Sequence, residues 1–589
     1  MLRGLFRTKS LDDILAAAGG PQFSLKRTLG AFNVTLIGIG GIIGAGIFAT
    51  IGTAASGVVD PDTGQLIRAG AGPSLMISFI ITAVVCGFTA LCYAELASMV
   101  PISGSAYTYS YATLGEIVAW IIGWDLIIEY AIGNVAVAIS WAEFFKRLLN
   151  NLGIPFPDWL ASNYRTATPE ILANAPHIAG VPIVFNLLAF GIVALITAVL
   201  VWGIRESAGF NAGMVFIKIL VLIFFVGVAL YYVPLGQMAQ NWNHPKTGFQ
   251  PQGWFGTFTG AAVVFFAYIG FDAVSTVAEE TKNPARDLPI GIIASLVICT
   301  ILYVVVAAVF TGMIPWETVR GWTAAQRGEA LTMALEQVNA PTWQNTVVAL
   351  GSVIAHTAVL LVFQLGQPRI FFSMARDGLL PPVFASVHPK FKTPHVTTII
   401  TGVLVGGIAA FATVDEMVSL TNIGTLFAFI LVCVGVIVLR RKDPGRPRPF
   451  RVPLGAYLLP LLGAGSCAFL IYFLPEGSYW RFLGWLAIGL SIYFAYGYAR
   501  SAVGQKAGRA ARTPPLLKVA AVGFLLVAVG LFYIPHDATF AQLVDKLTGA
   551  DPEQHGRTLA GFLMFLVGLV IGVGAASVGT TRAAGSPEV

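Results

Sequence analysis

The stretch "GIGGIIGAGIF", residues 38–48, places five glycines inside an apolar segment, residues 33–56, that is long enough to cross a bilayer. Each glycine weakens a helix by about 1 kcal/mol relative to alanine. One interpretation is close helix packing, because Gly40 and Gly44 have small-xxx-small spacing. The other is a break in the helix. A break leaves N–H and C=O groups unpaired, and lipid cannot satisfy them, so it must face a cavity or a ligand.

The composition predicts an all-α polytopic membrane protein. Of the 589 residues, 56% are hydrophobic and only 11% are charged, whereas soluble proteins carry about 25% charged residues. The apolar residues form blocks of the length that spans a bilayer. We predict 14 transmembrane helices, at residues 33–56, 73–100, 115–146, 182–204, 208–233, 255–280, 287–313, 344–375, 396–414, 418–440, 453–474, 481–500, 516–534 and 559–579.

Basic residues set the expected orientation. With the N-terminus inside, 23 Lys and Arg residues lie on that side, 10 lie on the other, and Lys218 and Arg369 lie within spans. This asymmetry predicts a protein of the plasma (inner) membrane with both termini cytoplasmic. The run "RRKDPGRPRPFR", residues 440–451, directly follows a span. We therefore interpret it as a topology anchor rather than a nucleic-acid site.

A second interruption lies in the sixth span, where Ala267–Gly270 precede the intramembrane acid Asp272. If spans 1–5 form one repeat, spans 1 and 6 correspond. Transporters built from inverted repeats carry paired broken helices in corresponding positions. The matched interruptions therefore favour transport over simple packing. The expected units are an N-terminal segment 1–32, repeats 33–233 and 255–441, helix pairs 453–500 and 516–579, and a tail 580–589.

Five stretches resemble the amino acid–polyamine–organocation transporter superfamily, and within it the cationic amino acid transporter family and its bacterial relatives. They are residues 38–48, "YAELASMVPISGSAYTYSY" (93–111), "GWDLIIEYAIGNVAVAISW" (123–141), "FFAYIGFDAVSTVAEETKNPARDLPIGI" (265–292) and "GQPRIFFSMARDGLLP" (366–381). The resemblance implies an inverted five-plus-five helix repeat with helices 1 and 6 unwound. It also implies alternating access rather than a pore.

The resemblance further assigns backbone groups to an L-amino acid substrate. A helix N-terminus suits a carboxylate, and free carbonyls suit an ammonium group. The carboxylate is expected at Ile43, Gly44, Ala45 and Gly46. The amino group is expected at carbonyls of Ile42, Phe266, Ala267 and Ile269, with Tyr268 in the same interruption.

Lys218 lies about ten residues into the fifth span. It matches a lysine that replaces the bound cation in proton-coupled relatives, so the resemblance implies a proton-coupling role. The alternative is snorkelling, or a structural hydrogen bond to a span-1 carbonyl.

Glu129 and Asp272 are intramembrane acids that could line the substrate cavity or belong to a structural network. By the same resemblance, Phe363 aligns with a span-8 position that helps to set side-chain selectivity. A phenyl ring there offers a cationic side chain no polar partner, so we lean to a neutral, small or medium substrate.

Other functions stay open. A cationic amino acid or polyamine transporter or exchanger fits the resemblance, and a non-transporting amino acid sensor would use the same site. No metal pattern, nucleophile–base pair or phosphate-binding motif suggests an enzyme. We expect no cofactor, a proton as coupling ion, the lipid bilayer as environment and no nucleic-acid partner; a small membrane subunit stays open.

Overall fold

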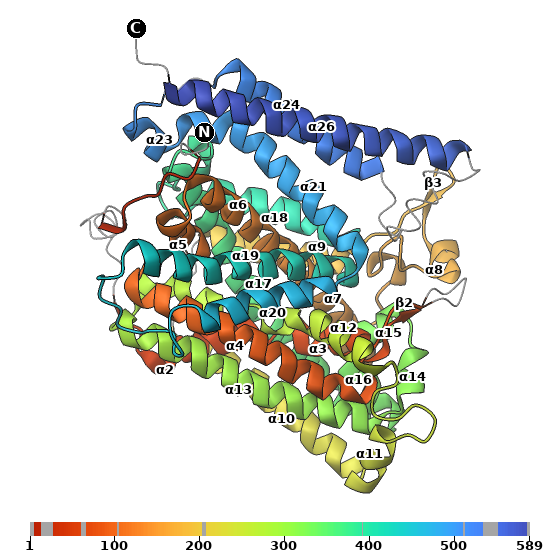
Figure 1. Ribbon diagram of the computed structural model, residues 1–589. Helices are drawn as coiled ribbons and strands as arrows, with labels where there is room; N and C mark the ends of the chain where they lie inside the picture. Colours follow the sequence, from red (N-terminus) through yellow and green to blue (C-terminus); the bar gives the residue numbers. More distant parts are fainter. Residues whose placement is uncertain are drawn as a thin grey trace.

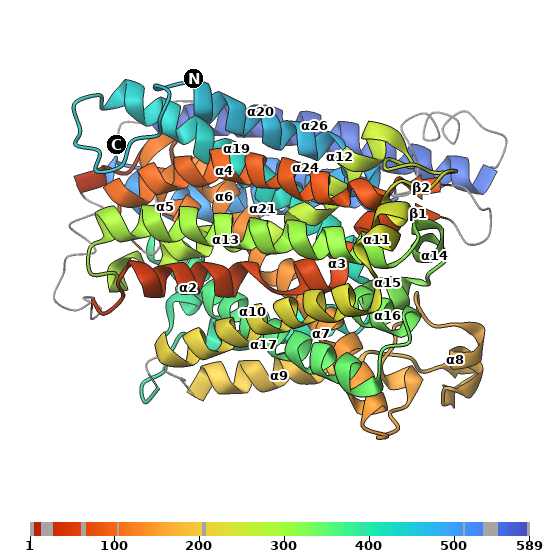
Figure 2. The same ribbon diagram turned by 90° about the horizontal axis from the view of Figure 1, so that it is seen from below.

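Most of the chain folds into helices that run side by side in one bundle (Figures 1 and 2). The computed structural model describes residues 5–12, 27–59, 66–102, 105–202, 208–391, 393–509, 513–533 and 552–585. Large apolar side chains are exposed along the outer helices, for example Leu220 and Ile223 on α10 (Ala208–Tyr232). Exposed apolar surface on this scale is what a lipid environment requires.

Ten helical stretches of the described chain are long and apolar enough to cross a bilayer. Besides α10, they contain α4 (Leu75–Met99), α6 (Glu116–Ile127), α7 (Gly133–Asn151), α12 (Gly253–Val264), α13 (Pro284–Met313), α17 (Thr342–Arg376), α19 (Val414–Lys442), α21 (Glu476–Ile492), α24 (Pro515–Tyr533) and α26 (Pro552–Gly585). Three predicted spans are shorter apolar helices, namely α9 (Leu187–Trp202), α18 (His395–Ala409) and α20 (Leu458–Tyr472). The first predicted span is a bent pair of helices, α2 (Ala31–Ile42) and α3 (Ala45–Ser56).

Short elements that the sequence did not predict occupy the connections. They are α5 (Ser105–Thr113), η3 (Asp158–Leu160), α8 (Pro169–Asn174), α11 (Leu235–Trp242), α14 (Trp316–Arg320), α15 (Ala324–Gly328), α16 (Ala330–Gln337), η6 (Pro382–Ala385) and α23 (Ala502–Lys506). Within predicted spans, η1 (Gly72–Ser74) begins the second span, and η7 (Tyr493–Gly497) and α22 (Tyr498–Arg500) end the twelfth. Strands β1 (Val58–Val59) and β2 (Leu66–Arg68) pair antiparallel, as do β3 (His177–Ile178) and β4 (Val181–Pro182). α14–α16 pack against α3 at one end of the bundle.

The last helices lie along one edge of the bundle, where α24 and α26 pack on each other and α24 packs on α21 (Figure 1). Glycines permit the close approach. A Cβ added to Gly523 would lie 2.7 Å from Gly572 Cα. α26 continues to Gly585, beyond the predicted end of the last span at residue 579.

A tryptophan pair fastens α21 to α6. The rings of Trp124 and Trp485 stack with centroids 4.4 Å apart. Trp124 Nε1 donates to the Trp485 carbonyl at 2.8 Å, and Trp485 Nε1 donates to the Trp124 carbonyl at 3.1 Å. This reciprocal pair joins the edge helices to the third span.

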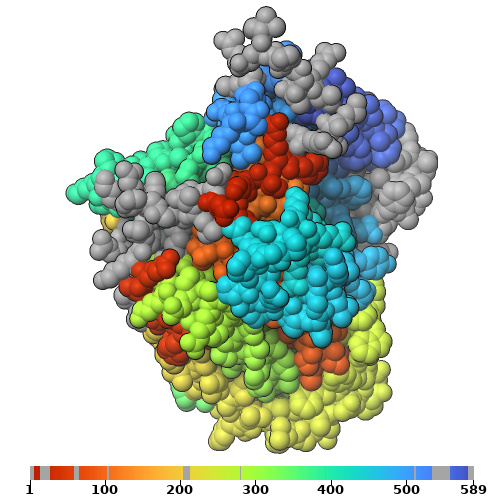
Figure 3. Space-filling view, turned by 60° about the vertical axis from the view of Figure 1, so that its left-hand side comes forward, coloured from red at the N-terminus to blue at the C-terminus, as the bar shows by residue number. Residues whose placement is uncertain are grey.

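The N-terminal residues lie at one end of the bundle. Lys9 Nζ pairs with Asp377 Oδ1 at 3.0 Å, just past the end of α17. Arg446, in the loop after α19, pairs with Asp12 at 2.7 Å, and Figure 3 shows this red N-terminal segment beside the cyan loop. We refer to this end as the N-terminal side of the bundle.

Candidate substrate site

The glycine-rich stretch divides the first span into two helices. α2 ends at Ile42, α3 begins at Ala45, and the two helices are bent by 41°. Between them Ile43 has ψ of 103° and Gly44 has φ of −161°, so both leave the helical conformation. Every residue from position 38 to 56 is buried. The last C=O groups of α2 and the first N–H groups of α3 therefore open into the protein interior and not toward lipid.

The sixth span is interrupted as well. α12 is followed by the 3₁₀ segment η4 (Phe265–Tyr268), an extended Ile269 and a second 3₁₀ segment, η5 (Asp272–Glu280). Gly270 has φ of +120°, a conformation that residues with a side chain rarely adopt. Asp272 Oδ1 accepts the Gly270 N–H at 3.2 Å. The chain thus changes direction at Gly270, and helical structure begins again at Asp272.

The two interruptions touch each other through their backbones. A Cβ added to Gly46 would lie 2.6 Å from Ala267 Cβ and 2.8 Å from Ala267 N. A Cβ added to Gly270 would lie 2.7 Å from the Gly41 carbonyl oxygen. Only glycine at these positions lets the main chains approach so closely. The structure therefore brings the predicted carboxylate segment and the predicted amino-group segment together in one buried place.

Carbonyls at the end of α2 are held by two polar side chains. Lys218 is fully buried, and its Nζ donates to the Gly40 carbonyl at 2.7 Å and to the Ile43 carbonyl at 2.9 Å. Tyr303 of α13 donates to the Ile42 carbonyl at 2.9 Å. The Ile42 carbonyl, expected to hold the substrate amino group, is therefore engaged by a side chain in this structure. The structural hydrogen bond considered for Lys218 is present.

Acidic side chains lie next to this site. Glu129 occupies the π-helical turn η2 (Ile128–Ile132), which separates α6 from α7, and it interacts electrostatically with Asp272. Single π turns inside α-helices are frequent at functional sites. Asp125, one turn before Glu129, is also buried, and neither of its carboxylate oxygens has a hydrogen-bond partner among the described residues.

Two aromatic residues occupy different positions around the site. Phe363 is 3% exposed, and its ring packs against Tyr130 with centroids 5.5 Å apart. A Cβ added to Gly133 would lie 3.2 Å from the Phe363 ring. Tyr268 instead donates its hydroxyl to the Phe79 carbonyl of α4 at 3.0 Å. The Tyr268 hydroxyl therefore bonds to the second span and not to the interruption in the first.

Sequence reasoning missed Tyr303 and Tyr130 as neighbours of the site. Tyr303 carries a hydroxyl group within the long apolar helix α13. This polar group in an apolar helix was the feature of the sequence that could have identified Tyr303 as a neighbour of the site. Tyr130 directly follows Glu129, but its contact with Phe363 joins segments that are far apart in sequence. Such a contact depends on helix packing.

The fold and the site define a polytopic membrane transporter. A family profile described as amino acid permease matches residues 29–495. The branched-chain amino acid permease BcaP of Bacillus subtilis (strain 168) is 46% identical over 505 residues, which cover 86% of this chain and all of the relative. The methylthioribose transporter of the same organism is 41% identical over 84% of this chain and 98% of its own length. Cationic amino acid transporter 4 of Homo sapiens is 33% identical over 76% of this chain and 64% of its own length.

The chain belongs to the amino acid permease family of the amino acid–polyamine–organocation superfamily. The resemblance seen in the sequence motifs is thereby confirmed. These relatives are transporters and not enzymes.

Proposed function

We propose that this permease imports neutral aliphatic L-amino acids by alternating access and that inward proton movement drives the import. The observation that carries the proposal is the buried contact between two broken spans, with Gly46 against Ala267. A helix N-terminus at Ala45 offers N–H groups to a carboxylate, and carbonyls of residues 266–269 offer acceptors to an ammonium group. Paired sites of this kind suit a zwitterion.

The expected substrate is a medium-sized neutral amino acid. Phe363 places an apolar ring beside Tyr130 near the site, and an apolar ring does not compensate a cationic side chain. The name of the relative with 46% identity, a branched-chain amino acid permease, supports the same choice. The methylthioribose transporter, at 41% identity, shows that relatives this similar differ in substrate. Cationic amino acids remain the second candidate because relatives named for them cover three quarters of the chain.

We further propose that the three shorter apolar helices α9, α18 and α20 also cross the membrane, which gives fourteen spans. Spans 1–5 and 6–10 then form inverted repeats, and the interruptions in the corresponding spans 1 and 6, which contact each other, support this arrangement. The basic-residue count places both termini in the cytoplasm of a cell whose plasma membrane holds the protein. The N-terminal side is then the cytoplasmic side.

Lys218 is our candidate for the proton-coupling residue. Its ammonium group holds two carbonyls at the break of the first span. Loss of the proton removes a charge and a donor from this contact, and hydrogen bonds to a charged group contribute about 1.5–3 kcal/mol. The protonation state of Lys218 would thereby alter the position of α2 relative to α10.

The test is uptake into proteoliposomes, measured for each of the twenty amino acids with and without an imposed pH gradient. We expect saturable uptake of L-leucine, L-isoleucine or L-valine that an inward proton gradient accelerates. Unlabelled methylthioribose and L-arginine serve as competitors and identify the alternative substrates. Binding without uptake would indicate a sensor, and uptake that does not saturate would indicate a channel.

A further inference from the structure

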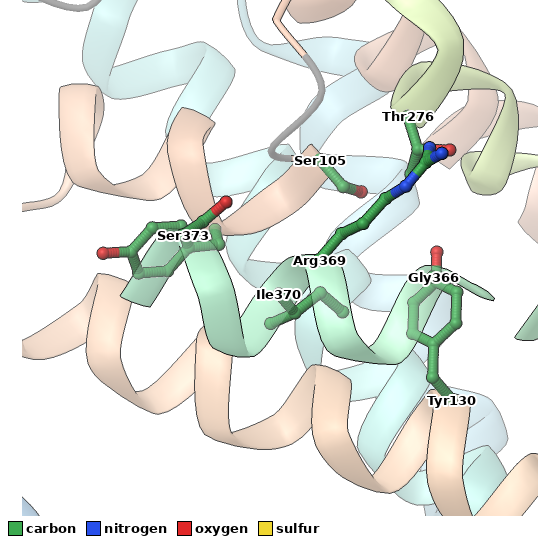
Figure 4. A pocket seen from close by; sticks show the side chains of 8 residues that line it. Ser105, Tyr130, Thr276, Gly366, Arg369, Ile370 and Ser373 are labelled. Carbon is green, nitrogen blue, oxygen red and sulfur yellow. The ribbon is translucent and has the colours of Figure 1, made fainter. Parts of the chain in front are cut away.

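A small cavity lies beside the Tyr130–Phe363 pair. Its free volume in this structure is about 10 Å³, which is room for about one water molecule. Its lining comes from four parts of the chain, as Figure 4 shows: Ser105, Tyr107, Tyr130, Thr276, Gly366, Arg369, Ile370 and Ser373. No role in the site described above uses this cavity.

The cavity continues from the candidate substrate site toward the N-terminal side. Gly366, Arg369 and Ser373 follow Phe363 along α17, and the six residues from Phe363 to Arg369 span about 9 Å of helix. Thr276 lies one turn after Asp272 on η5. At the far end, Tyr107 donates to Asp377 at 2.8 Å. The cavity therefore lies between the broken spans and the contacts of the N-terminal segment.

Tyr130 separates the cavity from the substrate site. Its ring packs on Phe363 and also on Gly366, where an added Cβ would lie 2.8 Å from the Tyr130 ring. Its buried hydroxyl has no hydrogen-bond partner among the described residues. It lies within electrostatic range of Asp272, Glu129 and Arg369. Tyr130 and Phe363 together form a partition between the two spaces.

Among the described residues of the lining, Arg369 is the one cation. Figure 4 shows its side chain extending along the cavity toward Thr276. No acidic residue in the described part of the chain forms an ion pair with it. The Arg369 side chain is half-buried. Guanidinium groups bind carboxylates through paired, charge-assisted hydrogen bonds. The hydroxyls of Ser105 and Ser373 are donors that complete the hydrogen bonding of such a ligand. Thr276 instead donates its hydroxyl to the Ala273 carbonyl at 2.7 Å.

We propose that this cavity widens, when the Tyr130 and Phe363 side chains move aside during transport, into a second binding station for the substrate, in which Arg369 holds the α-carboxylate of an amino acid that has left the broken helices. The proposal rests on the proposed transport function. The substrate would move past Tyr130 and Phe363. Its carboxylate would leave the N–H groups of α3 and bind the Arg369 guanidinium group. The substrate would then leave the protein on the N-terminal side. Every amino acid carries the α-carboxylate, so this station would act on all substrates alike.

Transport kinetics measured from each side test the proposal. The variant is Arg369→Gln, and the control is Arg376→Gln, an exposed arginine two turns further along the same helix. In proteoliposomes of defined orientation, Arg369→Gln should raise the KM for L-leucine presented on the N-terminal side by roughly tenfold or more, since one charge-assisted contact is lost. The KM from the opposite side should change less than about threefold. Equal changes on both sides, or none, would overturn the proposal.

Thiol labelling tests occupancy directly. The five native cysteines are buried, so Ser373→Cys adds a reporter in the lining. L-Leucine should slow the reaction of Cys at position 373 with a membrane-impermeant thiol reagent, and Arg369→Gln should remove this protection. Isopentylamine, which is leucine without its carboxyl group, should not protect. Protection by isopentylamine, or protection that persists in Arg369→Gln, contradicts the carboxylate station.

Two further measurements distinguish failure of the second binding station from misfolding of the variant and from failure of the proposed function. If Arg369→Gln does not survive purification, Arg369→Lys keeps the charge but loses the paired geometry, and its KM on the N-terminal side should rise by a smaller factor. An unchanged KM in Arg369→Lys together with undiminished protection refutes the proposal. If the wild-type protein transports no amino acid, the proposed function fails, whereas transport with unaltered Arg369→Gln kinetics refutes only the second station.

Discussion

Replacing Gly46 by alanine perturbs the contact on which the proposed function depends. In the structure a Cβ at Gly46 would lie 2.6 Å from Ala267 Cβ and 2.8 Å from Ala267 N. Ala267 Cα would lie closer still to the added Cβ, and ordinary van der Waals contact begins near 3.4 Å, so the two interrupted segments would have to separate by more than about 1 Å. Both partners are buried main-chain segments, and no flexible side chain can absorb the shift.

The expected consequence for Gly46→Ala is a large loss of transport with a smaller loss of stability. Overpacking in a buried region costs about 1–3 kcal/mol, offset by about 1 kcal/mol from the better helix propensity of alanine. A displacement of about 1 Å among groups that position a reactant lowers rates by roughly 100-fold. We therefore expect folded protein whose initial rate of L-leucine uptake is reduced by about two orders of magnitude.

The matched control is Gly87→Ala, in the middle of α4, where an added Cβ meets no atom within 4 Å. This variant should transport at the wild-type rate. The assays are initial-rate uptake in proteoliposomes and thermal unfolding with and without L-leucine. Wild-type uptake by Gly46→Ala would refute the reasoning, because the interrupted segments would then not need their close contact.

Three further substitutions test individual residues. Lys218→Ala should abolish the stimulation of uptake by an inward pH gradient, and full stimulation in this variant would contradict the coupling role. Tyr303→Phe leaves the buried Ile42 carbonyl without its hydroxyl donor, at a cost of about 1–3 kcal/mol. We expect a lower thermal unfolding temperature and slower uptake, and unaltered values of both would show that the hydrogen bond is dispensable. Phe363→Ser should make L-lysine uptake measurable while raising the KM for L-leucine, and an unchanged ratio of kcat/KM for the two substrates would remove Phe363 from the selectivity site.

The positions of the spans and the breaks could be predicted because their signals are local. Apolar blocks define the spans, and glycines inside such a block mark a backbone that must bend or be approached closely. The interruption after α2 and the positive φ at Gly270 both occur where these signals lie. The depth of Lys218 in its span raised the alternative of a hydrogen bond to a span-1 carbonyl, and this bond is present, whereas proton coupling stays a prediction.

What could not be predicted depends on contacts between distant segments. Tyr303 bonds to a residue 261 positions away in sequence, and nothing near Tyr303 specifies that carbonyl. The cavity beside Arg369 is assembled from four separate parts of the chain. The orientation of Tyr268 was equally hidden, since its hydroxyl could have faced either neighbour until α4 was placed.

The paired indoles of Trp124 and Trp485 restrict how the transport cycle can proceed. Trp124 lies five residues before Glu129 on the third span, so rotation of that span would shear two mutual hydrogen bonds, each contributing about 1 kcal/mol, as well as the ring stack. A movement that keeps these hydrogen bonds intact requires the third span and α21 to move together as one rigid unit. The outermost helices α24 and α26 then travel with the third span through the lipid, and bilayer thickness and viscosity become determinants of turnover.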